Sequence, residues 1–175
     1  NASFLNNHKL DAAIARTTND ARNLEAFLDT KYGKASWITA VNGNNLYLNK
    51  VTIDEQKLTL PIIQKEAADY LMTLPEVSFA LTADDLQTYV YEEGIRKTIQ
   101  NGYHVKRSGD VIISYSSGTI IHPNSNIDVE MVNGTVHGSG YSYDTHVPLI
   151  WSGKGIKSGE SVRAVNPIDI APSLS

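Results

Sequence analysis

The sequence predicts a domain of mixed α/β or α+β class, with helices layered against a sheet. Helical and strand patterns follow each other in the order helix, hairpin, helix, strand, helix, strand, long loop and strand. The chain has 175 residues, of which 41% are hydrophobic and 19% charged, and a net charge of −4. This composition is typical of a globular chain that forms one domain, or one and a half, around a core of its own.

Three stretches carry apolar residues at helical spacing. In residues 9–31 the apolar positions fall on one face, with Asp, Arg and Asn opposite. Residues 60–74 follow Thr59, which is a suitable N-cap, and Pro61 is tolerated in the first turn because its missing N–H has no partner there. The third stretch covers residues 84–101. Each of these stretches is predicted to be a helix.

Strands are predicted where short apolar runs lie between turn residues. Two such runs flank Asn42–Asn45, whose Asn and Gly residues accept the positive φ angles of a hairpin turn. Residues 116–140 are rich in Gly, Ser, Asn and Thr, so we expect a long loop with at most a short hairpin. The predicted strands are 37–41, 46–48, 77–81, 110–115 and 147–151.

Composition excludes several classes of function. The chain has no cysteine, so disulfides and thiolate metal sites are excluded. Its densest basic cluster is Lys106–Arg107, which gives nucleic-acid binding little electrostatic support. No apolar run approaches the ~20 residues that span a bilayer, so no membrane span is expected. The chain opens on Asn1 without Met and stops near Ser175 where a helix begins, so we expect a piece of a longer protein.

Two of the five histidines are candidates for chemistry. His137 and His146 flank a Gly/Ser/Tyr-rich loop that leads into the predicted strand 147–151. Active sites of α/β folds gather at strand ends, and a neutral imidazole there can bind a divalent metal. The alternative for His146 is a strand-edge histidine whose ring bonds to the backbone. Of the others, His8 is expected to be exposed, His104 structural or exposed, and His122 a loop residue.

Asp144 precedes His146 by two residues. Side chains alternate along a strand, so both could share a face, which would make Asp144 an outer partner of the imidazole. It could equally be a turn residue that caps its own backbone. The residues leave both interpretations open.

The segments HGSGYSYDTHVPLIWSGKGI (137–156) and NPIDIAPSL (166–174) resemble the C-terminal signature of the alkaline phosphatase superfamily. The resemblance is strongest to bacterial phosphate-irrepressible-type alkaline phosphatases and to the type I phosphodiesterase/nucleotide pyrophosphatases. KRSGDV (106–111) and NLYL (45–48) extend it, so it covers most of the chain from about residue 45. Ser173 stands where the family motif leads us to expect Thr.

This resemblance implies an alkaline-phosphatase-like α/β/α sandwich, of which the chain holds one corner. Residues 1–133 would form an accessory α+β subdomain, and residues 134–175 the C-terminal part of the metal-binding α/β core. His146 matches the family's zinc ligand in a site that holds a pair of zinc ions. Asp144 and His137 are the candidate outer partners. The nucleophile, the aspartate ligands and the remaining zinc histidine would lie upstream of this chain.

The implied function is that of a C-terminal fragment of a zinc-dependent phosphoric ester hydrolase, either a phosphomonoesterase or a phosphodiesterase. Such an enzyme transfers a phosphoryl group to a Thr or Ser hydroxyl and then hydrolyses the ester with water. The fragment alone is expected to be inactive and to hold no zinc firmly, because catalytic zinc sites usually need three protein ligands. A periplasmic or secreted location follows from the resemblance. The alternatives are a sulfatase or phosphonate hydrolase of the same superfamily, or a metal-less relative that serves binding or assembly.

Overall fold

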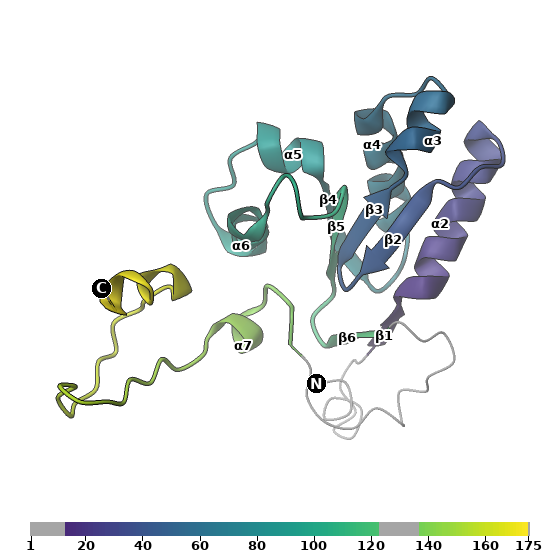
Figure 1. The fold of residues 1–175 in the computed structure, drawn as a ribbon. Coiled ribbons are helices and arrows are strands. Elements are labelled where there is room, and N and C mark those ends of the chain that lie inside the picture. Colours follow the sequence, from purple (N-terminus) through teal and green to yellow (C-terminus); the bar gives the residue numbers. More distant parts are fainter. Residues whose placement is uncertain (1–12, 123–136, 175) are drawn as a thin grey trace.

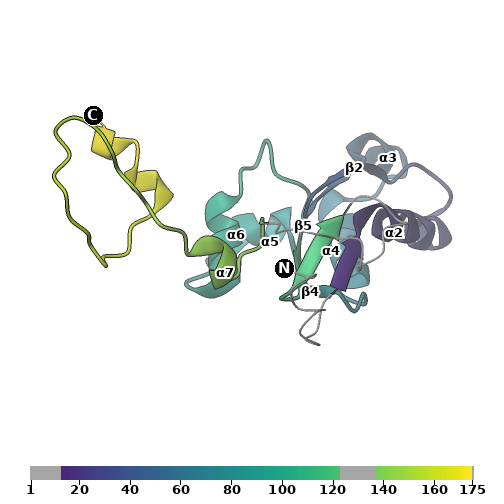
Figure 2. The ribbon, with the colours of Figure 1, turned by 90° about the horizontal axis from the view of Figure 1, so that it is seen from below.

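The computed structural model describes residues 13–122 and 137–174 of the chain (Figure 1). Residues 13–122 form a layered body that we call the α/β unit. Residues 137–174 form the C-terminal segment. Figures 1 and 2 both show this segment beginning beside the α/β unit and then running away from it toward the C-terminus. The contacts between segment and unit are therefore concentrated near the start of the segment.

The α/β unit is built on a four-stranded antiparallel sheet with the strand order β2-β3-β5-β4. A separate parallel pair joins β1 to β6, with Ala13 opposite Thr119. The mixed class predicted from the sequence is confirmed. The strands are β1 (Ala13–Arg16), β2 (Ile38–Asn42), β3 (Asn45–Leu48), β4 (Val77–Thr82), β5 (Val111–Tyr115) and β6 (Thr119–His122).

Helices cover both faces of this sheet, as Figure 1 shows. One core cluster joins α2 and α4 to the sheet, and a smaller one joins α5 and α6. The helices of the unit are α2 (Thr17–Tyr32), α3 (Lys50–Glu55), α4 (Leu60–Leu71), α5 (Ala83–Thr88) and α6 (Gly94–Gly102). The C-terminal segment holds the short turns α7 (Ser142–Thr145), η2 (Pro167–Asp169) and η3 (Pro172–Leu174).

Strand β5 is buried on both faces, and its sequence explains why. Successive side chains of a strand point to opposite faces, so an uninterrupted apolar run suits a strand with cover on both sides. Val111 and Ile113 enter the cluster of α2 and α4, whereas Ile112 packs with Leu86 of α5. Burying each of these side chains contributes about 1.5–3 kcal/mol to folding. The central strand therefore joins the two cores.

A buried carboxylate fastens the start of β5 to its neighbours. Asp110 is 6% exposed, and its Oδ2 accepts a hydrogen bond of 2.9 Å from the backbone N–H of Leu48. Its Oδ1 lies 3.2 Å from the Nζ of Lys50 and 3.5 Å from the Nε2 of Gln64. A buried charge is tolerated when it is hydrogen-bonded and paired in this way. Asp110 thus ties β5 to β3 and α4.

Several predicted elements are confirmed. The hairpin of β2 and β3 turns at Gly43, whose φ of 59° is the positive value that its turn requires. Helix α4 begins after the N-cap Thr59 with Pro61 in its first turn. Strands β4 and β5 occupy the predicted runs to within a residue or so.

The predicted helix 9–31 is wrong at its start. Residues 13–16 form strand β1, and α2 begins at Thr17, while residues 9–12 lie outside the described part of the chain. Four residues of helical spacing are weaker than a parallel ladder with β6, which pairs their backbone groups. Residues 119–122 correspondingly form strand β6 instead of a local hairpin, so His122 is a strand residue and not the loop residue that was expected. The weak run 129–132 lies outside the described residues.

The predicted helix 84–101 is two helices, α5 and α6, separated by residues 89–93. The side chain of Gln100 holds the break open. Its Oε1 accepts from the N–H of Tyr91 at 3.0 Å, and its Nε2 donates to the carbonyls of Leu86 and Tyr89 at 2.9 and 2.6 Å. These bonds satisfy backbone groups that a continuous helix would have paired itself. Helix α3, which was not predicted, begins where Asn49 accepts from the N–H of Thr52.

The predicted strand 147–151 is wrong. These residues form no strand, and the side chains of Val147 and Ile150 are 66% and 82% exposed. A strand needs a neighbour for its backbone groups, and within the described ranges no strand pairs with this run. The apolar residues of 147–151, which the pattern predicts to be buried, are therefore exposed in the described part of the chain.

We expect Asp110→Ala to lower the free energy of unfolding of the chain by roughly 3 kcal/mol, because the buried N–H of Leu48 would lose its charged acceptor. Asp110→Asn should cost less, since it keeps an acceptor oxygen. Urea denaturation followed by circular dichroism measures both. As a control, Asp69→Ala removes one side of the exposed pair with Lys65 and should leave stability unchanged. Equal losses for Asp110→Ala and Asp69→Ala would contradict the role of the buried carboxylate.

Candidate functional site

The sequence HGSGYSYDTH (137–146) lies against the α/β unit and presents the candidate ligand His146. The Tyr141 hydroxyl donates to the carbonyl of Tyr115, at the end of β5, over 3.1 Å. The N–H of Gly118 donates to the Tyr143 hydroxyl over 3.3 Å. The two tyrosine rings stack with their centroids 5.6 Å apart. Aromatic residues in this run therefore attach it to the end of the central strand.

Gly140 lets the run approach α6 closely. A Cβ atom at this position would lie 2.7 Å from Cγ2 of Ile95, which is closer than side-chain carbons pack. A side chain at this position would therefore require Ile95 to shift, and no positive φ angle calls for glycine here. Together with the tyrosines, it fixes this run to both α6 and β5.

Asp144 closes the run on itself. Its Oδ2 accepts from the N–H of Ser139 at 2.8 Å and from the Ser139 hydroxyl at 2.6 Å. Burial alone would raise the pKa of Asp144, but the hydrogen bonds of Ser139 and the nearby His137 imidazole outweigh it and hold the pKa below its ordinary value. Asp144 is therefore an ionised acceptor that bridges five residues of chain.

The described geometry of Asp144 is that of a turn residue. Residues 142–145 form the turn α7, so Asp144 and His146 do not share a strand face, and that expectation is wrong. The carboxylate bonds to the local backbone and hydroxyl of Ser139, as a turn residue does. Its link to His146 runs through the backbone of α7.

His146 is exposed and ends α7 as its C-cap. Its backbone N–H donates to the carbonyl of Ser142 at 2.9 Å. Within residues 13–122 and 137–174, His146 is bonded through its backbone N–H and not through its ring, so the strand-edge alternative finds no support there. The ring is therefore accessible to a ligand.

The described residues hold no group of three or more His, Cys, Asp or Glu side chains that could bind a metal ion. His146 would thus be a single ligand in this part of the chain. The ring of His104 accepts at Nδ1 from the N–H of Lys106 over 3.2 Å, as expected of a structural histidine. His8 and the side chain of His122 lie outside the described part.

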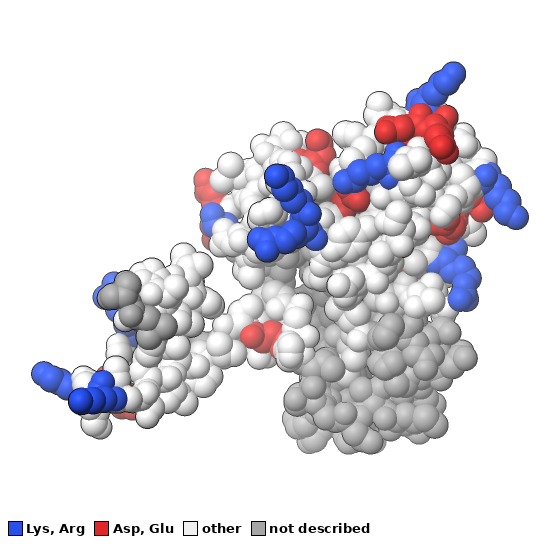
Figure 3. Space-filling model, in the orientation of Figure 1, with Lys and Arg blue, Asp and Glu red and all other residues white. Residues whose placement is uncertain are grey.

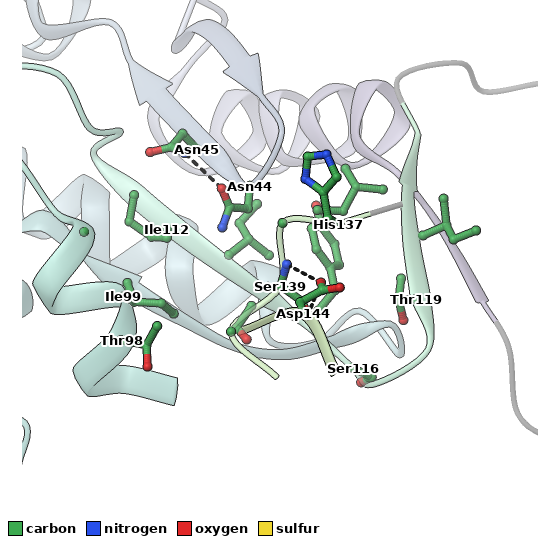
Figure 4. A pocket seen from close by; sticks show the side chains of 18 of the residues that line it. Asn44, Asn45, Thr98, Ile99, Ile112, Ser116, Thr119, His137, Ser139 and Asp144 are labelled. Carbon is green, nitrogen blue, oxygen red and sulfur yellow. Dashed lines mark hydrogen bonds between the residues drawn. The ribbon is translucent and has the colours of Figure 1, made fainter. Parts of the chain in front are cut away.

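Beside this run lies a cavity of about 300 Å³ (Figure 4). The β2–β3 turn contributes Asn44 and Asn45, α6 contributes Thr98 and Ile99, and the run 137–144 closes the cavity from the other side. Figure 4 shows His137, Ser139 and Asp144 side by side along this wall. His146 is not among the lining residues. The structure thus brings His137 and Asp144 together but leaves His146 outside the cavity.

No local signal in the sequence indicated this cavity. Its walls come from segments that are up to 100 residues apart, as Asn44 and Asp144 are, and only the folded sheet brings them together. The mixture of amide, hydroxyl and imidazole groups with isoleucine side chains gives the cavity both polar and apolar walls. Asn44 and Ser139 were therefore missed as candidate site residues.

On the face that Figure 3 shows, Lys and Arg side chains are interspersed with Asp and Glu over the α/β unit and do not form a single basic patch. Among the described helices, none combines the length and the apolar character needed to cross a bilayer.

Comparison with known proteins identifies relatives over almost the whole chain. The chain is 30% identical over 172 residues to the alkaline phosphatase PafA of Elizabethkingia meningoseptica. The aligned residues cover 98% of this chain and 30% of PafA. It is also 26% identical to a Myroides odoratus protein named calcium-transporting ATPase. That match covers all 175 residues of this chain and 31% of the other protein. Alkaline phosphatase PhoV of Synechococcus elongatus is 28% identical to this chain over 153 residues. These residues make up 87% of this chain and 26% of PhoV. No protein-family model matches the sequence.

The crystal structure of wild-type PafA superposes with a TM-score of 0.83 at 29% identity, covering 99% of this chain and 31% of that one. The fold is therefore an alkaline-phosphatase-like α/β fold, and the relatives support the alkaline phosphatase superfamily for this chain. The chain spans about a third of the length of the curated relatives that it matches.

We expect Gly140→Ala to loosen the run 137–146, because the new methyl group would meet Ile95. Overpacking of this kind costs about 1–3 kcal/mol. Hydrogen exchange of the His146 amide, which bonds to Ser142, should become faster. Adding Ile95→Ala makes room for the methyl group and should restore slow exchange. Unchanged exchange in Gly140→Ala would show that Ile95 does not hold the run.

Proposed function

We propose that this chain is the C-terminal portion of a zinc-dependent phosphoric ester hydrolase, and that His146 is one of its zinc ligands. The observation that carries the proposal is the accessible imidazole at the end of a turn fastened to the α/β unit, within a motif that resembles the superfamily's zinc-ligand segment. Similarity to alkaline phosphatases over nearly the whole chain supports it.

The chemistry of His146 fits a metal ligand, but one histidine is not enough. A neutral imidazole binds zinc through one ring nitrogen, and the other usually donates to a carboxylate or carbonyl. Catalytic zinc sites usually have three protein ligands, and the described residues gather no such group. Following the superfamily resemblance, we propose that the remaining ligands and the Thr or Ser nucleophile belong to polypeptide outside this chain.

When bound, zinc supplies Lewis-acid polarisation of a phosphate ester and activation of the water that hydrolyses it. The role proposed for this chain is to hold the imidazole of His146 in a fixed position. The exposed apolar residues after His146 would pack against the remainder of the protein, which would bring the ring into the completed site. The substrate would be a phosphate monoester or diester, and the protein would act in the periplasm or outside the cell.

We expect His146→Ala in the full-length protein to lower EDTA-sensitive hydrolysis of p-nitrophenyl phosphate by more than about 100-fold, because a metal ligand is lost. Zinc content, measured by atomic absorption, should fall by about one ion for each protein. His104→Ala, which changes a histidine of the α/β unit that bonds to Lys106, is the matched control and should keep zinc and turnover. Full zinc content and activity in His146→Ala would exclude the proposed ligand.

The 175-residue chain alone should not hydrolyse p-nitrophenyl phosphate or bis(p-nitrophenyl) phosphate, whereas the zinc-loaded full-length protein should hydrolyse at least one. The ratio of the two rates in the full-length protein distinguishes monoesterase from diesterase. Turnover by the isolated chain would contradict the proposed division of the site. Absence of chelator-sensitive turnover in the full-length protein would favour a metal-less relative that serves binding or assembly.

A further inference from the structure

We propose that Asp144 is a positioning residue for the zinc ligand His146, and that the α/β unit is the rigid support on which the pair is mounted. This inference rests on the proposed function, in which His146 binds zinc. It adds a role for Asp144, Ser139 and Tyr141 that does not require any of them to touch metal or substrate.

The first step is that α7 is too short to be stable by itself. It has four residues, and a single helical turn is unfavourable without outside contacts because fixing its backbone costs more than its hydrogen bonds return. The N–H groups of Asp144 and Thr145 both donate to the carbonyl of Tyr141, at 2.9 and 3.0 Å. Something outside the turn must therefore hold it.

The second step is the bond from Asp144 to Ser139. One carboxylate oxygen accepts both the N–H and the hydroxyl of Ser139, at 2.8 and 2.6 Å. Hydrogen bonds to an ionised acceptor are about twice as strong as neutral ones. They join the first turn of α7 to the residue that precedes Gly140, so the loop that carries His146 is closed at its base.

The third step is the attachment of this closed loop to the sheet. The Tyr141 hydroxyl donates to the carbonyl of Tyr115, and the Tyr143 hydroxyl accepts from Gly118. Gly140 lies against Ile95 of α6. The loop is thus attached at three separate places, to β5, to the β5–β6 turn and to α6, and attachment at three places restricts its movement more than attachment at one.

The last step leads to the ring. His146 follows Thr145 directly, and its N–H caps the turn on Ser142. The direction in which the imidazole leaves the backbone is therefore set by α7. Groups behind a metal ligand that fix its orientation typically change metal affinity by 10–100-fold when removed. Asp144 has this place in the structure without a bond to the ring.

The test measures zinc affinity of the full-length protein by competition with a chromogenic chelator, together with the visible spectrum of the cobalt-substituted protein. Asp144→Ala should weaken the affinity of one zinc site roughly 10–100-fold and alter the cobalt spectrum. Asp144→Asn keeps an oxygen that can accept from Ser139, so it should restore most of the affinity. Ser139→Ala, which removes the hydroxyl but keeps the N–H, should lie between them.

The matched control is Asp85→Ala. Asp85 also accepts a local backbone N–H in the first turn of a short helix, from Thr82 over 3.2 Å, but it belongs to α5. Its variant should keep wild-type zinc affinity and cobalt spectrum. If Asp85→Ala reduces affinity as much as Asp144→Ala, the effect is general loss of stability and the positioning role is refuted.

His146→Ala separates the two proposals. If it keeps full zinc affinity, the zinc-ligand proposal fails and the positioning role fails with it. If His146→Ala loses zinc while Asp144→Ala binds it as tightly as the wild type, the positioning role alone is wrong. Loss of affinity in His146→Ala and Asp144→Ala, with rescue in Asp144→Asn, supports both.

Discussion

The whole α/β unit depends on how Asp110 joins its elements at the start of β5. Its carboxylate accepts the N–H of Leu48 and approaches Gln64, so β3 and α4 share one buried charge. Its backbone N–H donates to Leu46, and its carbonyl accepts from Ala83 at the start of α5. A single residue at the start of β5 therefore bonds to β3, α4 and α5, and its carboxylate also pairs with Lys50 of α3. Because a buried charge without these partners would be costly, the arrangement permits few alternatives.

Strand β5, which Asp110 precedes, also connects the core of the α/β unit to the candidate site. Strand β5 runs from Val111 to Tyr115, buried along its length, and the carbonyl of Tyr115 receives the hydroxyl of Tyr141. The segment that presents His146 is thus attached to the most constrained strand of the unit. A metal ligand benefits from such support, since its geometry must be kept within a fraction of an ångström. This connection would make the α/β unit the support of the proposed zinc ligand without contributing a ligand itself.

Local patterns were sufficient to predict those elements that local forces determine. The hairpin at Gly43, helix α4 after Thr59 and the apolar strand β5 all follow from turn chemistry, capping and hydrophobic periodicity. The failures lie where distant residues decide. Gln100 interrupts the helix predicted over 84–101 by bonding to backbone groups up to 14 residues away, and β1 exists because β6 pairs with it. Neither interaction can be predicted from a short stretch of sequence, because each joins residues that are far apart along the chain.

The candidate site divides in the same way. A short motif singled out His146 as a candidate, because its signal lies in adjacent residues, whereas the bond of Asp144 to Ser139 forms only once the turn α7 is in place, and the sequence left that turn as one of two alternatives. The wrong prediction of a strand is itself informative about the apolar run 147–151. Its residues have the character of a buried strand, yet the described part of the chain offers them no partner. His146 therefore stands at a junction, with its N-terminal side fixed to the α/β unit and its C-terminal side carrying apolar surface that still requires cover. In the proposed function, this place would let the α/β unit hold the imidazole while the other ligands come from elsewhere.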